Sequence, residues 1–304
     1  MRSGPRVHCA TTTTMDAPER IAGLPDIQSQ VDSRDLPIDA VGVNRVRYPI
    51  TIQAGRRRVP TIAILSMTVE LPAVTKGTHM SRFIELLEAR TDAMDQAGFK
   101  AVLLDMLNRL DARSGAIDMR FPYFVRKTAP VSGVQSQLDY EVSWRGSVSE
   151  DGRYSFWMHV TVPVTSLCPC SKEISAYGAH NQRSHVGVEA ELAGEMAIEE
   201  LIAIAERCAS CEVYALIKRP DEKFVTERAY DNPKFVEDLV RDVALALNQE
   251  PRVRAYVVEA ENFESIHNHS ACACIARTIP EAGSARSSKQ RDRHLRLLST
   301  STAG

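Results

Sequence analysis

The stretch Tyr154-Ser-Phe-Trp-Met-His-Val-Thr-Val-Pro-Val164 repeats with a period of two residues. Its apolar positions are Tyr154, Phe156, Met158, Val160, Val162 and Val164, and Ser155, Trp157, His159 and Thr161 stand between them. Successive side chains of a β-strand point to opposite faces, so this pattern predicts a strand that is buried on one face only. Such a strand belongs to an antiparallel sheet with one covered face.

The residues before this strand predict elements in the order ββααββ. Strands are expected at 46–53 and 61–71, where β-branched residues alternate. A helical pattern follows, stops at Gly98 and resumes, which predicts two helices. Further strands are expected at 119–128 and 138–148.

The same order starts again at Tyr154. The strands expected there are 154–164, 186–192, 253–259 and 270–276. Between them we expect a helix at 196–207 and a second helix, opened by Asn232 and Pro233, that runs to about residue 247. The sequence therefore predicts an α+β protein with two tandem ββααββ modules, whose antiparallel sheets are each covered by a helix pair.

Four parts of the chain are expected from this order. Residues 1–40 would form an N-terminal arm, partly disordered, and 41–150 the first module. Residues 151–280 would form the second module, which carries most of the reactive residues. Residues 281–304 hold five Lys or Arg against two acids, which predicts a disordered, solvated basic tail. Near the other end, a start at Met15 is a simpler interpretation than a transit peptide.

The composition of the 304 residues favours a globular protein, with 44% hydrophobic and 25% charged residues. A formal net charge of -2 provides no general attraction for nucleic acid or for an anionic membrane. The sequence has no apolar run of about 18 residues and no secretory signal pattern, so we expect a cytoplasmic protein. Six of the seven cysteines fall in close pairs, which in a reducing compartment indicates metal or thiol chemistry.

The densest group of reactive side chains is Ser166-Leu-Cys-Pro-Cys-Ser-Lys-Glu-Ile-Ser-Ala-Tyr-Gly-Ala-His180, directly after the predicted strand. Cys168, Cys170, His180 and His185 could form a closed structural zinc site, although a C-x-C pair gives a cramped chelate. Alternatively, only some of them hold a metal, and a position stays open for water as in catalytic sites. The sequence leaves both interpretations open.

Other segments could supply the remaining ligands of an open site. Glu222 lies in a predicted link between the two helices of the second module, and His267 and His269 lie at a turn between two strands. Glu237 falls at the edge of the apolar face of its helix, so periodicity alone does not distinguish it. Cys208 and Cys211, at a helix end without a thioredoxin-like context, are interpreted as small buried hydrophobic residues.

Four motifs resemble those of the GTP cyclohydrolase IB family. They are Leu167-Cys-Pro-Cys-Ser-Lys-Glu-Ile-Ser175, Ala179-His-Asn-Gln-Arg183, Lys76-Gly-Thr-His-Met-Ser-Arg-Phe83 and Arg219-Pro-Asp-Glu-Lys223. The resemblance extends from about Ala17 to Pro280. It implies the tunnelling fold, which is built from ββααββ units with two units per chain, and a homotetramer with active sites at subunit interfaces. The order of elements predicted above agrees with this fold.

The activity implied by the resemblance is hydrolytic opening of the imidazole ring of GTP at C8. Formate is lost, and rearrangement gives 7,8-dihydroneopterin triphosphate, the entry to folate-type pterins. This chemistry needs a Lewis acid that makes water nucleophilic near neutral pH, a group that binds guanine, and positive charge for the triphosphate. The sequence does not decide whether the product feeds folate or a modified tRNA base.

The resemblance also assigns roles to residues. Cys168, His180 and Glu222 match metal ligands, and His267 is either a further ligand or a proton shuttle. A thiolate, an imidazole and a carboxylate suit Zn, Mn or Fe. The resemblance therefore implies a divalent metal, and the sequence does not say which one. Cys170 would be a second thiolate that moves or donates protons.

Substrate contacts follow in the same way. Glu237 matches the family's purine-anchoring carboxylate, and Lys76, His79, Arg82 and Lys172 are candidates for the triphosphate. GTP would be the substrate, with no further nucleotide cofactor, no nucleic acid and no membrane partner. Two alternatives remain: a non-catalytic module stabilised by zinc, and another tunnelling-fold enzyme such as a nitrile reductase, for which the sequence shows no dinucleotide motif.

Overall fold

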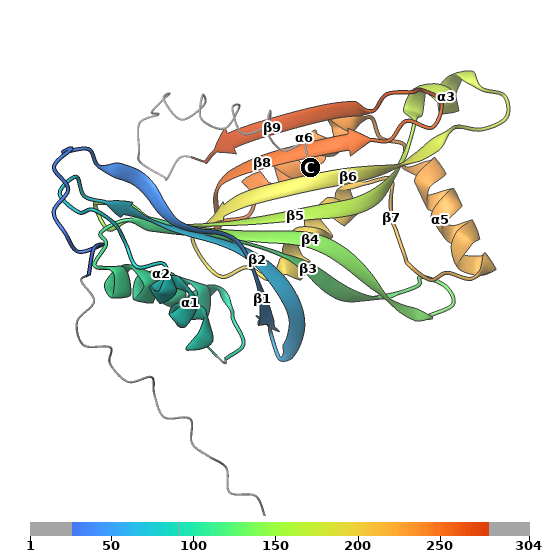
Figure 1. Ribbon diagram of the computed structural model, residues 1–304. Coiled ribbons are helices and arrows are strands. Elements are labelled where there is room, and N and C mark those ends of the chain that lie inside the picture. Colours follow the sequence, from blue (N-terminus) through green and yellow to red (C-terminus); the bar gives the residue numbers. More distant parts are fainter. Residues whose placement is uncertain (1–25, 91, 280–304) are drawn as a thin grey trace, which may run out of the picture.

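The alternating stretch forms strand β5 (Tyr154–Leu167), which lies in the middle of the sheet (Figure 1). The computed structural model describes residues 26–90 and 92–279. Every second side chain from Phe156 to Val164 is buried, with at most 3% of its surface exposed. The strand predicted from periodicity is therefore confirmed, and it continues for three residues beyond Val164.

The other elements follow in chain order. The remaining strands are β1 (Ile38–Ala54), β2 (Arg57–Leu71), β3 (Gly115–Thr128), β4 (Gln135–Val148), β6 (Asn181–Leu192), β7 (Cys211–Glu212), β8 (Val253–Asn262) and β9 (Ala271–Thr278). The helices are α1 (Ser81–Glu88), α2 (Gln96–Leu110), α3 (Pro169–Ile174), α4 (Ile198–Cys208), α5 (Arg219–Asp231) and α6 (Val236–Asn248). None of these helices is long and apolar enough to cross a bilayer; this finding covers the described residues only.

The strands form one continuous sheet in the order β1-β2-β3-β4-β5-β6-β8-β9, with β7 paired to β5. All the pairs are antiparallel. The β4–β5 ladder, from Glu141↔Thr161 to Val148↔Tyr154, joins the two predicted modules into this single sheet. Backbone hydrogen bonds thus connect the two halves of the chain directly.

Helices cover one face of the sheet. Helix α2 packs on β3 and β4, α4 on β5 and β6, and α6 on β8 and β9. The α+β class and the two successive ββααββ sets are confirmed, and this is the tunnelling-fold order that the resemblance implies. The second set contains three additional elements, α3, β7 and α5, and all three lie near the end of β5 (Figure 1).

The expected N-terminal arm reaches the sheet before residue 40, because β1 already begins at Ile38. Its described part follows the loop after β2: Val31 bridges to Thr75, and the Asp32 N–H donates to the Val74 carbonyl at 3.0 Å. Residues 1–25 of the expected arm and the expected tail at 281–304 lie outside the described residues.

The predicted break at Gly98 is wrong. Helix α1 ends at Glu88, and Gly98 lies inside the first turn of α2. Asp95 is the N-cap of α2, and its carboxylate accepts the Gly98 N–H at 2.7 Å. Glycine is common just after a helix, but here the carboxylate three residues earlier caps a helix start, so Gly98 belongs to the first turn.

Two predictions for the second half are also wrong. The segment 219–223 is not a link but the first turn of α5, where Pro220 occupies a position that needs no N–H donor. Asn232 ends this helix instead of opening the next one: its side-chain amide donates to the Ala209 carbonyl at 2.8 Å. Helix α6 consequently begins at Val236.

An aromatic cluster joins α2 to the sheet. The rings of Phe99, Phe121, Trp144 and Phe156 meet edge to face, with centroids 5.6 to 5.8 Å apart. Gly146 lies beneath this cluster on β4, and a Cβ atom there would stand 2.8 Å from Cε1 of Phe99. Only a residue without a side chain lets α2 approach the sheet this closely.

We expect Gly146→Ala to lower the free energy of unfolding by about 1 to 3 kcal/mol, because the added methyl group overpacks the Phe99 contact. Gly194→Ala is the matched control, since the nearest atom to its new Cβ is Arg252 Cγ at 3.7 Å. Denaturant titrations of both variants check the prediction. Equal midpoints for Gly146→Ala and the parent chain would contradict this packing constraint.

Candidate active site

Three strand ends meet at one edge of the sheet. Leu167 at the end of β5 pairs with Asn181 at the start of β6, and Ser184 of β6 pairs with Asn262 at the end of β8. Helix α3, the start of β6 and the β8–β9 loop at 263–270 follow directly from these ends. Figure 1 shows α3 and α5 at this same edge.

A row of buried polar side chains fixes these strand ends. The hydroxyls of Ser166 and Ser184 lie 2.7 Å apart, and Ser184 donates to Oδ1 of Asn262 at 2.6 Å. The Leu167 N–H donates to the hydroxyl of Ser210 at 3.2 Å. All three serines are fully buried. This row was not predicted from the sequence, although Ser166 continues the buried phase of β5 and so carries a polar group at an inward position.

Cys168 and His180 are held together by their backbones. The Cys168 N–H donates to the His180 carbonyl at 3.2 Å, and the His180 N–H donates to the Ser171 hydroxyl at 3.2 Å. That hydroxyl in turn donates to the Cys168 carbonyl at 3.1 Å. Cys168 is half-buried as the N-cap of α3, whereas Cys170 is exposed on the same helix. The loop from 168 to 180 is thus closed by a small hydrogen-bond network.

The β8–β9 loop approaches His180. The Nδ1 atom of His180 lies 3.1 Å from the Ser265 hydroxyl. Two residues later, the exposed ring of His267 stacks on that of His269, with centroids 5.0 Å apart and planes at 16°. The turn predicted here is confirmed.

Glu222 is exposed on the first turn of α5, and a buried neighbour holds that turn. Both carboxylate oxygens of Asp221 are occupied: one accepts the N–H groups of Val131 and Ser132 at 2.8 Å each, and the other accepts the Ser132 hydroxyl and the Lys218 N–H. Burial raises the pKa of Asp221, but these hydrogen bonds outweigh it and hold the pKa far below its usual range.

Helix α5 also packs against the strand that leads to Cys168. Ala229 and Val225 contact Leu167, Cys211 and Ala179 in a small apolar cluster. Glu222 precedes Val225 by about one helical turn, so it lies at the same edge of the sheet as Cys168. Cys211 is buried and Cys208 half-buried, and burial raises the pKa of both thiols. Their interpretation as small hydrophobic residues is confirmed.

Glu237 lies in the first turn of α6 and is exposed. The chain just before α6 is fixed to the end of β5, because the Lys234 N–H donates to the Leu167 carbonyl at 3.1 Å. Lys234 also forms an ion pair at 2.6 Å with Asp242, which lies eight residues later inside α6. The start of α6 is therefore adjacent to the residue that precedes Cys168.

Lys172 is engaged within the protein. Its Nζ donates to the Tyr230 carbonyl at 2.5 Å and lies 4.3 Å from the centre of the Tyr230 ring. It thereby ties α3 to the end of α5.

The other three cationic candidates lie at the opposite end of the sheet. Lys76, His79 and Arg82 follow the end of β2. Across β3 and β4, that end is in register with the start of β5, through Gly115, Val148 and Tyr154. Strand β5 has 14 residues, and at about 3.3 Å per residue it separates the two ends by roughly 45 Å. One chain does not bring these three residues to Cys168.

Those residues contact the chain locally instead. Lys76 donates to the side chain of Gln30 at 3.1 Å, and Arg82 donates to the Arg109 carbonyl at 2.9 Å. His79 Nε2 lies 3.4 Å from a carboxylate oxygen of Asp26.

The donor atoms near the end of β5 suit a divalent transition metal, since they include a thiol, imidazoles and a carboxylate. Within residues 26–90 and 92–279, however, no three His, Cys, Asp or Glu side chains lie close enough to hold a metal ion. A closed site of Cys168, Cys170, His180 and His185 is accordingly not formed, and the His185 ring packs edge-on against Phe263 at 4.9 Å. Cys168 and His180 are adjacent, but Glu222 and His267 do not complete a ligand set around them.

Comparison with known proteins gives consistent matches. Residues 24–273 match the family described as Type I GTP cyclohydrolase folE2. GTP cyclohydrolase FolE2 of Paraburkholderia xenovorans is 60% identical over 255 residues, which cover 84% of this chain and 95% of that protein. GTP cyclohydrolase FolE2 of Cupriavidus necator is 57% identical over 254 residues, with 84% and 95% covered.

Among solved structures, uricase from Arthrobacter globiformis aligns with a TM-score of 0.47 and 8% sequence identity, covering 82% of this chain and 95% of that one. The family match begins before β1, ends inside β9 and includes all four motifs quoted above. By this match and by the identity to its relatives, the chain belongs to the FolE2 family of type I GTP cyclohydrolases.

Proposed function

We propose that this chain is a type IB GTP cyclohydrolase that opens the guanine ring of GTP at C8 and releases formate. The product would be 7,8-dihydroneopterin triphosphate, the precursor of folate-type pterins, made in the cytoplasm. The observation that carries the proposal is the pairing of Cys168 with His180 at the end of β5, beside the start of the helix that bears Glu237. Incubation with GTP and Mn²⁺ or Zn²⁺, with detection of formate and pterin fluorescence, tests it.

Cys168, His180 and Glu222 would hold the divalent metal, with His267 as a further ligand or a proton carrier. When bound, the metal supplies the Lewis acidity that makes water a nucleophile near neutral pH. This donor set suits Zn, Mn and Fe equally, so it does not decide which metal binds. The hydrogen bonds around Asp221 support this role for Glu222, because they fix the first turn of α5 against the β3–β4 loop.

The chain's own residues bind and orient the substrate. An ionised Glu237 offers two acceptors to the N1–H and the exocyclic amine of guanine, whereas adenine would place a lone pair against it. The exposed thiol of Cys170 stands two residues from Cys168 on α3, where it can give a proton to the opened ring. Lys172 would contribute charge near the triphosphate once released from Tyr230.

A homotetramer would complete the site. Lys76, His79 and Arg82 lie at the far end of the sheet in one chain, so they can reach a triphosphate near Cys168 only from another subunit. The edge strands β1 and β9, each paired on one side in the described chain, offer backbone groups for such an assembly. In such an assembly the active sites would lie between subunits.

We expect Cys168→Ser and His180→Ala each to abolish GTP turnover and metal binding while the circular dichroism spectrum stays unchanged. The reason is that both residues lie in the connection between β5 and β6 and contribute little to the core. Cys272→Ser, at an exposed position on β9, is the control and should keep full activity. Unfolding of the parent chain when metal is removed would instead favour a structural zinc module.

Glu237→Gln should lower kcat/KM for GTP on the order of a hundredfold, about as much as Glu237→Ala. Each hydrogen bond to a charged group contributes roughly 1.5 to 3 kcal/mol, and the amide would turn one acceptor into a donor that faces a donor. Glu85→Gln, an exposed carboxylate on α1, is the matched control. Near-normal kinetics for both Glu237 variants would show that this carboxylate only faces solvent.

A further inference from the structure

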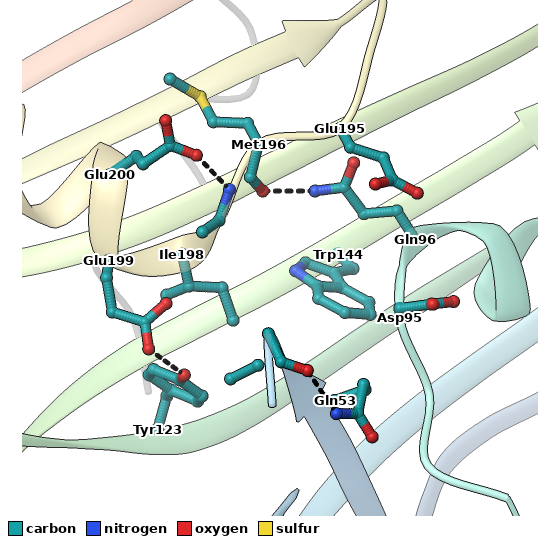
Figure 2. Close-up of a pocket in the computed structure, with 13 residues that line it drawn as sticks. Gln53, Asp95, Gln96, Tyr123, Trp144, Glu195, Met196, Ile198, Glu199 and Glu200 are labelled. Atoms are coloured by element: carbon teal, nitrogen blue, oxygen red, sulfur yellow. Dashed lines mark hydrogen bonds between the residues drawn. The ribbon is translucent and has the colours of Figure 1, made fainter. Parts of the chain in front are cut away.

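A cavity lies far from the Cys168 end of the sheet. It has a volume of about 430 Å³, opens to the surface, and is lined by the end of β1, the starts of α2 and α4, and the side chains of Tyr123 and Trp144 (Figure 2). Trp144 pairs with Met158 on β5, nine residues before Leu167, so roughly 30 Å separates the cavity from Cys168. Its size is that of a small-molecule site.

The indole N–H of Trp144 has no acceptor among the described residues, although the side chain is only 2% exposed. Buried donors are almost always paired, so this unpaired group requires an explanation. Figure 2 shows the indole nitrogen pointing into the cavity while its polar neighbours bond to one another. Tyr123 donates to Glu199 at 2.6 Å, and Gln96 donates to the Met196 carbonyl at 2.5 Å.

The rim of the cavity is acidic. Its lining includes Asp95, Glu195, Glu199 and Glu200 and contains no Lys, Arg or His. Asp95 caps α2, Glu199 accepts from Tyr123, and Glu200 is paired with Arg252 at 2.9 Å. In the described part of the chain, the carboxylate of Glu195 takes part in no hydrogen bond or ion pair, while its backbone carbonyl accepts from the Arg252 guanidinium at 3.0 Å. The carboxylate itself is therefore available to a ligand.

The remaining walls are apolar or aromatic. Ile198 and Met196 are buried at one side, and the rings of Tyr123 and Trp144 form the floor. A flat apolar body can pack on these surfaces, and a cation held near the rings gains a cation–π attraction.

We propose that this cavity binds a small aromatic amine whose far end carries a hydrogen-bond acceptor. The ammonium group would face the rim at Glu195, the body would pack on Ile198 and the rings, and the acceptor would take the indole N–H of Trp144. The cavity joins the start of α2 in the first ββααββ set to the start of α4 in the second. A bound ligand therefore links the two helix pairs and stabilises the folded chain.

The probe is 4-methoxyphenethylamine, which has an ammonium group at one end and an ether oxygen at the other. Two related compounds test which groups of the probe contribute to binding. Phenethylamine lacks the acceptor, and 4-methoxyphenylacetate replaces the cation by an anion. Calorimetry on the full chain should show saturable binding of the probe, binding roughly 3- to 10-fold weaker for phenethylamine, and none for the acetate. The melting temperature should rise with the probe concentration.

Fluorescence locates the binding. The chain has two tryptophans, so Trp157→Phe leaves Trp144 as the only indole. The probe should shift the emission of this variant with the same saturation curve as in calorimetry. An unchanged emission despite binding would place the probe elsewhere and overturn the proposal.

Two variants test the assigned groups. Glu195→Gln should lower the affinity for the probe about threefold, while Glu150→Gln, at an exposed turn, should leave that affinity unchanged. Trp144→Phe keeps an aromatic ring but should remove the preference for the probe over phenethylamine. The proposal is wrong if no saturable binding occurs below about 10 mM, if the acetate binds as well as the amine, or if Glu195→Gln leaves the affinity unchanged. Glu195 lies at the surface, so that variant remains informative even where Trp144→Phe destabilises the fold.

Discussion

The rest of this structure depends on the backbone ladder that joins β4, β5, β6 and β8, whose one register shift lies between Glu191 and Leu192. Because β5 is hydrogen-bonded on both sides, its residues are fixed in register with those of three other strands. Its apolar face then determines where helices can pack, since Phe156, Met158 and Val160 are fully covered. The same register determines which loops meet where the strand ends, and Cys168 is the first residue beyond that end.

Order at this edge comes from polar contacts within the apolar layer. Ser166, Ser184 and Asn262 replace hydrophobic side chains at inward positions, and they bond to one another across three strands. Buried polar groups that are fully paired specify one geometry more strictly than apolar contacts do. Asp221 acts similarly for α5, whose first turn it fastens to the β3–β4 loop. The reactive residues can therefore be exposed while their attachment points are rigid.

Sequence reasoning succeeded where a residue's role depends on its neighbours along the chain. The alternation in β5, the strand end before Cys168 and the turn around His267 were all local patterns, and the four motifs identified the family. It failed at Gly98, at Asn232 and at the segment 219–223. Each error concerned a helix end, where one side-chain hydrogen bond decides between helix and turn. For Asn232 the decisive partner, the Ala209 carbonyl, is 23 residues away in the chain.

The sequence by itself determined the class of fold, the repeated ββααββ order of its main elements and the group of reactive residues after β5, because periodicity and motifs are properties of neighbouring residues. Only the tertiary structure showed that Lys76, His79 and Arg82 lie a full strand length from Cys168, and that Trp144 directs an unpaired N–H into an acidic cavity. Both facts depend on how distant segments are brought together. The reason is physical: antiparallel register and side-chain packing place residues in space by contacts that no local stretch of sequence contains.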